Sequence, residues 1–190
     1  MSPNELVKMG SNFLKKNNIK THLLDSELIL SSISGQTREN FLVDNNQKLT
    51  TAQIKSYNSM ILRRGLAKEP IAYLLNEKEF WSIKLNINKS VLIPRPETEI
   101  LVENLIKYFK DTNPFILDVG TGSGCIIVSL LQELKKSKGV AIDISNKALK
   151  IARKNSVINN TFNRIKFVNS SITKFNSHKF DLVVSNPPYI

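Results

Sequence analysis

The sequence predicts an α/β fold with a doubly wound parallel sheet, preceded by a small all-α helical domain. From residue 113 onward, short apolar segments alternate with helical ones, an order that gives parallel strands joined by crossover helices. Residues 1–75 show mainly helical periodicity, and a length of 190 residues suits one ordinary domain plus a small one. We expect a helical domain over 1–76, a linker or hairpin over 77–96 and an α/β domain over 97–190.

The first domain is expected to be a bundle of short helices. Apolar residues recur at helical spacing over 6–14 and again over 24–33. Signals for helix starts are found at three further places: Asp25, a plausible cap; Thr50 with Gln53, which have the spacing of a capping box; and Pro70, which suits the first position of a helix.

The middle of the chain changes character. Alternating apolar residues predict a half-buried strand over 80–87 in a hairpin-like stretch, with Trp81 in the core at the domain junction. Pro94 and Pro96 predict an extended loop over 92–97, because each proline disfavours helix in the residue before it. A helix follows, with an apolar face made of Ile100, Leu101, Leu105 and Tyr108. Beyond it we expect strands over 115–119, 140–142, 165–168 and 180–184, and helices over 125–134 and 147–158.

Charge and composition narrow the class of protein. Lys and Arg exceed Asp and Glu by 27 to 16, a net charge of +11. The excess is spread along the chain, which favours a solvated surface over direct nucleic-acid binding. Cys125 is the single cysteine, which excludes an internal disulfide and suits a reducing cytosol. No apolar run is long enough to span a membrane. A cytoplasmic location with no membrane partner is expected.

A glycine-rich turn follows the first strand of the predicted sheet: Gly120, Thr121, Gly122, Ser123 and Gly124. Ligands bind at this position in α/β sheets, and glycine lets the backbone approach a ligand closely. Asp143 ends the next strand, where a carboxylate can accept hydrogen bonds from two ribose hydroxyls. Turn and acid together indicate a nucleoside cofactor, with a ligand-free turn and a simple helix cap as the alternatives. The incomplete glycine spacing, with Ile127 in the third place, disfavours a dinucleotide.

The segment Asn186-Pro187-Pro188-Tyr189 follows the last predicted strand. The Asn186 side-chain oxygen and the Pro187 carbonyl could accept both N–H bonds of a planar NH2 group and aim its nitrogen at a methyl donor. The prolines would stiffen the loop, and Tyr189 could pack on the flat face of the target group. An ordinary turn is the alternative interpretation.

These motifs, together with Ile93-Pro94-Arg95-Pro96-Glu97-Thr98-Glu99, resemble the HemK/PrmC family of peptide chain release factor glutamine methyltransferases. The resemblance implies a Rossmann-like class I methyltransferase sheet and S-adenosyl-L-methionine as cofactor. It implies that the substrate is the glutamine of the Gly-Gly-Gln motif in class 1 peptide chain release factors, with the helical domain helping to dock them. It also implies the roles of two sets of residues. The cofactor would be held by Gly120, Thr121, Gly122, Ser123, Gly124 and Asp143, with Asn186 beside it, and the glutamine by Asn186, Pro187, Pro188 and Tyr189.

The sequence departs from the family pattern in two places. Ser171 and Ile172 stand where the family commonly has an acidic pair that contacts adenine. The chain also ends at Ile190, directly after the signature, so that only the amino-terminal half of the sheet is expected, with the strand over 180–184 as an exposed apolar edge.

Other functions and sites stay open at this point. One alternative is an adenine-N6 or RNA nucleobase methyltransferase, because an exocyclic amine is also a planar NH2 group; another is a truncated fragment without turnover. His22 and His178 match no metal spacing, so surface roles and no metal site are expected. Cys125 is expected to pack near the glycine turn, with a lowered thiol pKa at the helix start as the alternative. Arg95 and Glu97 are expected either to order the site or to form an ion pair between the domains.

Overall fold

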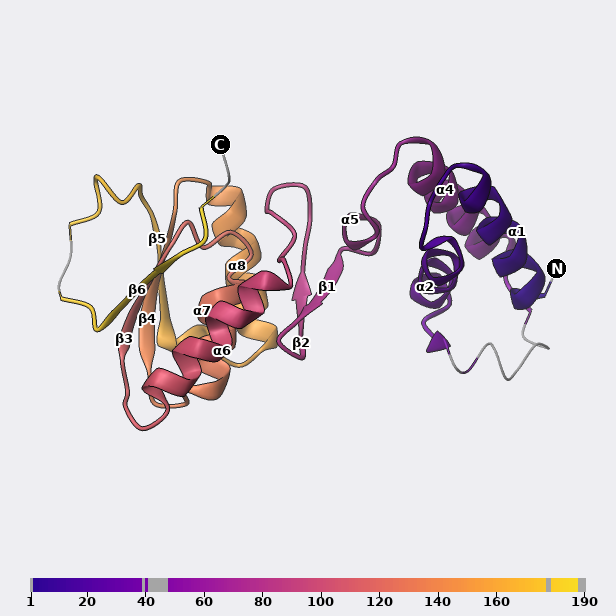
Figure 1. Cartoon of the computed structure of the whole chain (residues 1–190). Helices are drawn as coiled ribbons and strands as arrows, with labels where there is room; N and C mark the ends of the chain where they lie inside the picture. The colour runs from indigo at the N-terminus through magenta and orange to yellow at the C-terminus, as the bar shows by residue number, and fades with distance from the viewer. Residues whose placement is uncertain (1, 39, 41–47, 177–178, 188–190) are drawn as a thin grey trace. The chain divides into compact units, whose positions relative to one another are not determined.

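A computed structural model describes residues 2–38, 40, 48–176 and 179–187, and the chain divides into two compact units, Met1–Leu75 and Asn76–Ile190 (Figure 1). The first unit is helical and the second contains the parallel sheet, so the predicted fold class is confirmed. No helix in the described ranges is long and apolar enough to cross a lipid bilayer.

The helical unit contains α1 (Pro3–Lys16), α2 (His22–Ser34), α4 (Thr51–Leu66) and the short α5 (Ile71–Leu75). The predicted capping box is confirmed, because Thr50 Oγ1 accepts from the Gln53 backbone N–H while the Gln53 side chain accepts from that of Thr50. α5 begins directly after Pro70, one residue later than predicted. The core of the unit is made of apolar side chains that are almost fully buried, among them Leu6, Leu14, Ile29, Leu30 and Tyr57.

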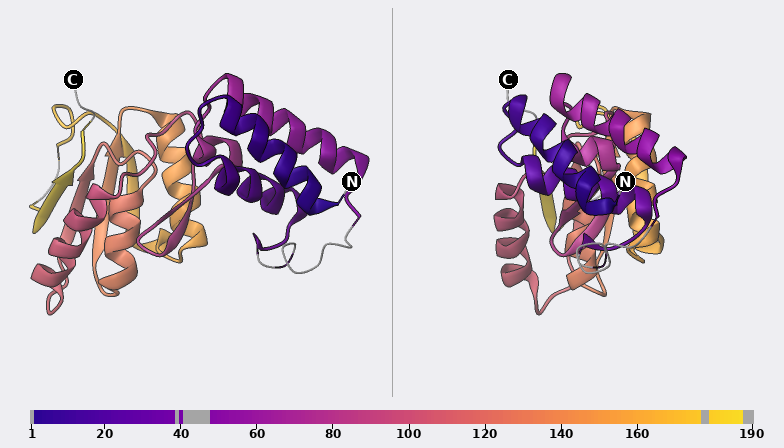
Figure 2. Two further views of the ribbon diagram at one scale, coloured as in Figure 1. Left: turned by 45° about the vertical axis from the view of Figure 1, so that its right-hand side comes forward. Right: turned by 90° about the vertical axis from the view of Figure 1, so that its right-hand side faces the viewer.

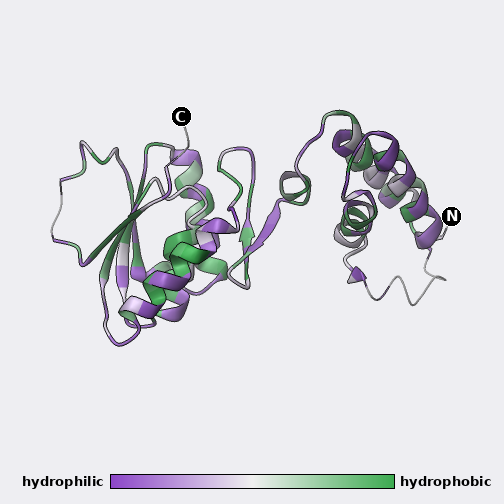
Figure 3. Ribbon diagram, viewed as in Figure 1, coloured by the Kyte–Doolittle hydropathy of each residue, from purple (hydrophilic) through white to green (hydrophobic). Residues whose placement is uncertain are grey.

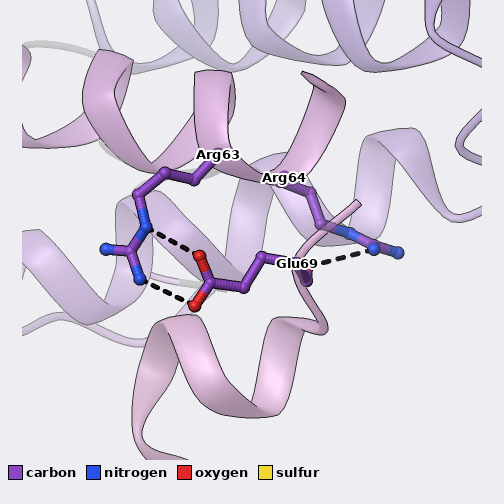
Figure 4. Close-up of polar contacts among 3 residues, drawn as sticks. All are labelled: Arg63, Arg64 and Glu69. Carbon is purple, nitrogen blue, oxygen red and sulfur yellow. Dashed lines mark hydrogen bonds and ion pairs between the residues drawn. The ribbon is translucent and has the colours of Figure 1, made fainter. Parts of the chain in front are cut away.

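The predicted cap at Asp25 is wrong. α2 starts earlier, at His22, and Asp25 lies in its first turn with its side chain buried against α4, where it accepts from Arg64 Nε at 2.7 Å. Arg64 also donates to the Glu69 carbonyl oxygen, and Arg63 donates to both carboxylate oxygens of Glu69, as Figure 4 shows. Aspartate at a helix start suggests a cap only while its tertiary partners are unknown; here a buried charge is paired instead.

The second unit opens with a hairpin, which corrects the single strand predicted over 80–87. β1 (Glu77–Phe80) and β2 (Ile83–Asn86) pair antiparallel, and Trp81 and Ser82 form the turn with φ of 51° and 55°. The prediction that Trp81 lies in the core is also wrong. Its ring is only partly buried, and its indole Nε1 donates to Glu133 Oε1 at 3.1 Å.

The main sheet has four parallel strands in the order β5-β4-β3-β6. The strands are β3 (Phe115–Val119), β4 (Lys138–Asp143), β5 (Ile165–Asn169) and β6 (Leu182–Ser185). After β5 the chain crosses to the far side of β3, so the order reverses between β3 and β6, as in a doubly wound sheet. β6 is therefore an edge of the sheet among the described residues, and Figure 3 shows it to be largely hydrophobic.

Three helices lie on one side of this sheet, as Figures 1 and 2 show: α6 (Glu97–Phe109), α7 (Cys125–Glu133) and α8 (Asn146–Ile158). A 3-10 turn, Phe162–Arg164, precedes β5. On the other side, Phe175 and Phe180 from the segment before β6 pack on Leu117, Val140 and Ile142.

The predicted apolar face of α6 is only partly right. Thr98 and Val102 are the buried residues of this helix, whereas Ile100 and Tyr108 are 60% and 81% exposed. Hydrophobicity alone misplaced the face by about one residue, because a small polar side chain, Thr98, occupies a buried position. α6 also begins at Glu97, the last residue of the predicted loop.

Candidate functional site

The carboxyl ends of β3 and β6 meet where the strand order reverses. Val119 pairs with Ser185 in parallel register, and Ser185 Oγ donates to the Val119 carbonyl oxygen at 2.9 Å. Gly120 follows β3 and Asn186 follows β6, so the glycine turn and the asparagine loop lie side by side although 66 residues separate them. This switch point is where open α/β sheets bind ligands.

The glycine turn has a backbone that other residues would adopt only with strain. Gly120, Gly122 and Gly124 have φ of 69°, 55° and 79°. At Gly124 a side chain would also be crowded by α8, because a Cβ built there lies 3.1 Å from the Ala152 Cβ. The backbone N–H groups of Gly120 and Thr121 both donate to the Ile142 carbonyl oxygen, at 2.9 and 3.0 Å, which ties the turn to β4.

Asp143 lies under the turn at the end of β4. One carboxylate oxygen accepts from the Gly122 N–H at 2.9 Å and the other from the Ser145 N–H at 2.8 Å. Each oxygen keeps a second lone pair, so Asp143 can hold the turn and still accept hydrogen bonds from a ligand. Only 9% of the residue is exposed, which limits the directions from which a ligand can reach it.

Asp118 was not singled out as a candidate from the sequence, but it anchors the same turn. It is the fourth residue of β3, is almost fully buried and accepts from Thr121 Oγ1 at 2.6 Å. Burial raises the pKa of its carboxyl to about 6; the hydrogen bond from Thr121 opposes this shift, and the nearby Asp143 carboxylate adds to it. An acid two residues before a glycine turn was a signal available in the sequence.

Asn186 lies at the opposite wall of the site. Its side-chain Nδ2 donates to Thr98 Oγ1 at 3.1 Å, in the first turn of α6. Its Oδ1 accepts no hydrogen bond from the described part of the chain. Pro187 is exposed, and Pro188 and Tyr189 lie outside the described residues.

A cavity of about 50 Å³ lies between these elements. The glycine turn, Asn186, Cys125 and the segment before α6, including Pro94 and Arg95, line it. Arg95 therefore lies at the site in this unit, while Glu97 is exposed at the start of α6. The cavity joins three segments that the sequence analysis had singled out separately.

The minor candidates have structural roles. Cys125 lines the cavity, but burial raises the pKa of its thiol to about 12, so the alternative of a lowered pKa is wrong. His22 Nδ1 lies 2.8 Å from Ser11 Oγ and joins α1 to α2. His178 lies outside the described residues, and the described ranges contain no cluster of His, Cys, Asp or Glu suited to a metal.

A second supporting residue, Asn155 of α8, carried no motif in the sequence. It is fully buried, and its Nδ2 donates to the carbonyl oxygens of Ser123 (2.8 Å) and Asn86 (3.0 Å), while its Oδ1 accepts from the Asn86 N–H at 2.6 Å. Asn155 thus links β2 to the glycine turn.

At the predicted adenine position, where the family commonly has an acidic pair, Ile172 is 52% exposed. Close by in the chain, Asn169 Nδ2 donates to the Asp143 carbonyl oxygen.

A parallel sheet with a glycine turn at its switch point defines the chain as a class I methyltransferase-like protein. The tRNA m1G37 methyltransferase of M. jannaschii shares this fold, with a TM-score of 0.51 and 20% identity over 60% of this chain and 35% of that one. Residues 96–190 match the methyltransferase small domain, and residues 5–75 match the PrmC N-terminal domain. The chain belongs to the HemK/PrmC family.

Curated relatives match over nearly the whole chain. The release factor glutamine methyltransferase of Caulobacter vibrioides is 39% identical over 93% of this chain and 62% of its own length. The enzyme of that name from Buchnera aphidicola subsp. Acyrthosiphon pisum is 40% identical over 93% and 63%. A bifunctional methyltransferase of Rickettsia typhi is 36% identical over 98% of this chain and 40% of its own. The chain thus spans between two fifths and two thirds of these relatives.

Proposed function

We propose that the whole protein methylates the side-chain amide nitrogen of the glutamine in the Gly-Gly-Gln motif of class 1 peptide chain release factors, with S-adenosyl-L-methionine as the methyl donor. The observation that carries the proposal is the position of Asn186, anchored through Nδ2 and facing the glycine turn across one cavity. The names of the relatives support the substrate. Such a reaction belongs to the cytoplasm, where translation terminates.

The residues present fit the cofactor. Open space adjoins the turn, because a Cβ built at Gly120 would meet no atom within 4 Å. We assign residues 120–124 to contacts between the protein backbone and the cofactor. We assign Asp143 to hydrogen bonds with the ribose hydroxyls of the cofactor and place Asn186 beside its methyl group. The cavity of about 50 Å³ is partly open to solvent. The adenosine would lie along the open surface beside Asp143.

Methyl transfer to an amide is a problem of orientation. The amide nitrogen is a poor nucleophile because its lone pair is delocalised into the carbonyl group. Asn186 Oδ1 and the Pro187 carbonyl oxygen would accept its two N–H bonds and direct the nitrogen toward the sulfonium methyl group that the cofactor supplies. We assign the packing of the flat amide to Pro188 and Tyr189. The amide proton becomes acidic as the bond to the methyl group forms, so no strong base is required.

The test is a methylation assay of the full-length protein. A class 1 release factor is incubated with the protein and S-adenosylmethionine, and the Gly-Gly-Gln peptide is analysed by mass spectrometry. We expect the mass gain of one methyl group on the glutamine, its absence in a release factor with glutamate at that position, and a loss of at least about a hundredfold in rate for Asn186→Ala. An unmodified glutamine would refute the proposal.

A nucleobase remains the second candidate substrate, since an exocyclic amine would meet the same acceptors. The same assay with RNA and DNA oligonucleotides separates the two. Methylated adenine together with tight, salt-dependent oligonucleotide binding would favour the second candidate.

The helical unit is the proposed docking element for the release factor, so deleting residues 1–75 should raise KM for the release factor more than it changes cofactor affinity.

A further inference from the structure

Thr98 connects two segments whose relation the sequence left open. It belongs to the Ile93–Glu99 segment, which starts α6, while Asn186 belongs to the loop after β6, 88 residues further on. The Thr98 Oγ1 to Asn186 Nδ2 hydrogen bond, at 3.1 Å, joins them directly. Thr98 is only 5% exposed, so its hydroxyl is largely withdrawn from water.

The first turn of α6 is held in place on several sides. The Thr98 N–H donates to the Arg95 carbonyl oxygen at 3.0 Å, and Glu99 Oε1 accepts from the Trp81 N–H at 2.9 Å. Val102, one turn along on the same face, is fully buried. The Thr98 hydroxyl therefore occupies a fixed point relative to the sheet, and there it accepts the hydrogen bond from Asn186 Nδ2.

An asparagine amide needs such a constraint. Its oxygen and nitrogen are nearly equal in size, so the group can turn over with little steric cost while exchanging an acceptor for two donors. In the wrong orientation, Asn186 would direct its NH2 group at the NH2 group of the substrate, and two donors would oppose each other. A partner that receives Nδ2 leaves Oδ1 as the acceptor.

We propose that Thr98 is a positioning residue whose hydroxyl holds the Asn186 amide with Nδ2 turned toward α6 and Oδ1 available to the substrate's NH2 group. This assignment rests on the proposed function for its catalytic consequence, but not for the orientation itself. It gives the Ile93–Glu99 segment a role in substrate orientation, besides lining the cavity. Thr98 does not contact the reacting atoms; it acts through Asn186.

The test compares Thr98→Val, which removes the hydroxyl but keeps the shape, with Thr98→Ser, which keeps it. In the full-length protein we expect Thr98→Val to lower kcat on the order of tenfold to a hundredfold, with the Kd for S-adenosylmethionine unchanged within twofold. Thr98→Ser should restore most of the loss. In an Asn186→Ala background, Thr98→Val should have little further effect, because the group it positions is gone.

Thr112→Val serves as the matched control. It removes a hydroxyl near the other end of α6 that donates to the Phe109 carbonyl oxygen, in an exposed position far from the cavity in sequence and fold. We expect unchanged kcat. Full turnover in Thr98→Val, or an equal loss in the Asn186→Ala background, would overturn the proposal.

A second readout does not depend on turnover. In 15N-labelled protein, the Asn186 side-chain NH2 signals, assigned by their loss in Asn186→Ala, should shift and exchange faster with water in Thr98→Val but not in Thr98→Ser or Thr112→Val. If the wild-type protein methylates no release factor, the proposed function fails while this measurement still decides the orientation. Asn186 signals in Thr98→Val that match those of the wild-type protein would show that Thr98 does not hold the amide.

Discussion

At the scale of single residues, burial decides the chemistry of two ionisable groups at the glycine turn, Asp118 and Cys125. Asp118 and Cys125 both have a raised pKa, and in both cases the largest cause is the loss of water around the charged form. The raised pKa makes Cys125 a poor nucleophile, and Asp118 is not among the residues that line the cavity. Their side chains support the backbone of the turn.

Cys125 should react slowly with alkylating reagents. Because the pKa of the thiol is raised to about 12, its thiolate fraction at pH 8 is small. We expect alkylation by iodoacetamide on the order of a hundredfold slower in the native protein than in guanidinium chloride. The single cysteine makes the readout unambiguous. Equal rates in the two states would contradict the raised pKa of this thiol.

Asp118 should make stability depend on pH. Its folded-state pKa of about 6 lies above the ordinary value of 3.8, so the native state binds the proton more tightly than the unfolded state. Its favourable contribution is complete below about pH 4 and is lost as the pH rises through about 6. Relative to Asp118→Asn, we expect the wild type to lose up to about 3 kcal/mol of unfolding free energy between pH 4 and 7.

Urea unfolding followed by the fluorescence of Trp81, the single tryptophan, measures this difference in the α/β unit alone. The isosteric Asn keeps the shape and removes the titration. A difference between the two proteins that stays constant from pH 4 to pH 7 would contradict the raised pKa.

At the scale of elements, polar side chains rather than apolar contacts join several segments around the site. Asn155 ties α8 to the hairpin and the turn, and Arg164 donates to the carbonyl oxygens of Leu131, Leu134 and Ser137 at the end of α7. Such contacts satisfy backbone groups that the ends of helices and strands leave free.

Asn155→Ala should destabilise the α/β unit strongly. It would remove the hydrogen-bond partner of three backbone groups: the Asn86 N–H, the Asn86 carbonyl and the Ser123 carbonyl. We expect a loss of about 2 to 4 kcal/mol in the urea unfolding of this unit. Asn146→Ala, at the exposed start of the same helix, should cost less than about 1 kcal/mol and serves as the control. Similar losses in both variants would argue against a special role for Asn155.

In the helical unit, the pair of Arg64 and Asp25 should matter more than the pair of Arg63 and Glu69. The side chains of Arg64 and Asp25 are 17% and 3% exposed, whereas those of Arg63 and Glu69 are 49% and 9% exposed. Arg64→Met would leave a buried carboxylate unpaired, so we expect a loss of about 3 kcal/mol, against about 1 kcal/mol or less for Arg63→Met.

Amide hydrogen exchange of α2 and α4 measures these two losses within the helical unit. Asp25→Asn combined with Arg64→Met should recover part of the loss, because the unpaired charge is gone. Equal protection in Arg63→Met and Arg64→Met would contradict the ranking.

At the scale of the whole molecule, most elements of regular structure follow from local sequence. The strand at 115–119 and the capping box at Thr50 were predicted residue by residue, because strand periodicity and capping depend on neighbours in the chain. The turn at Trp81 and Ser82, which divides the strand predicted over 80–87, was missed because a turn with two positive φ values formed without glycine. Asp25 was misassigned because its partner, Arg64, is 39 residues away.

In the candidate site, too, local sequence determined some features and distant contacts determined others. Sequence alone was enough to single out the glycine turn, Asp143 and Asn186, since each follows a recognisable strand and carries its own chemistry. Folding alone brings Thr98 to Asn186 and Asn155 to Ser123, across 88 and 32 residues. Periodicity and motifs report on a few neighbouring positions, whereas the direction of a side-chain amide or the burial of an acid depends on which distant segment packs against it.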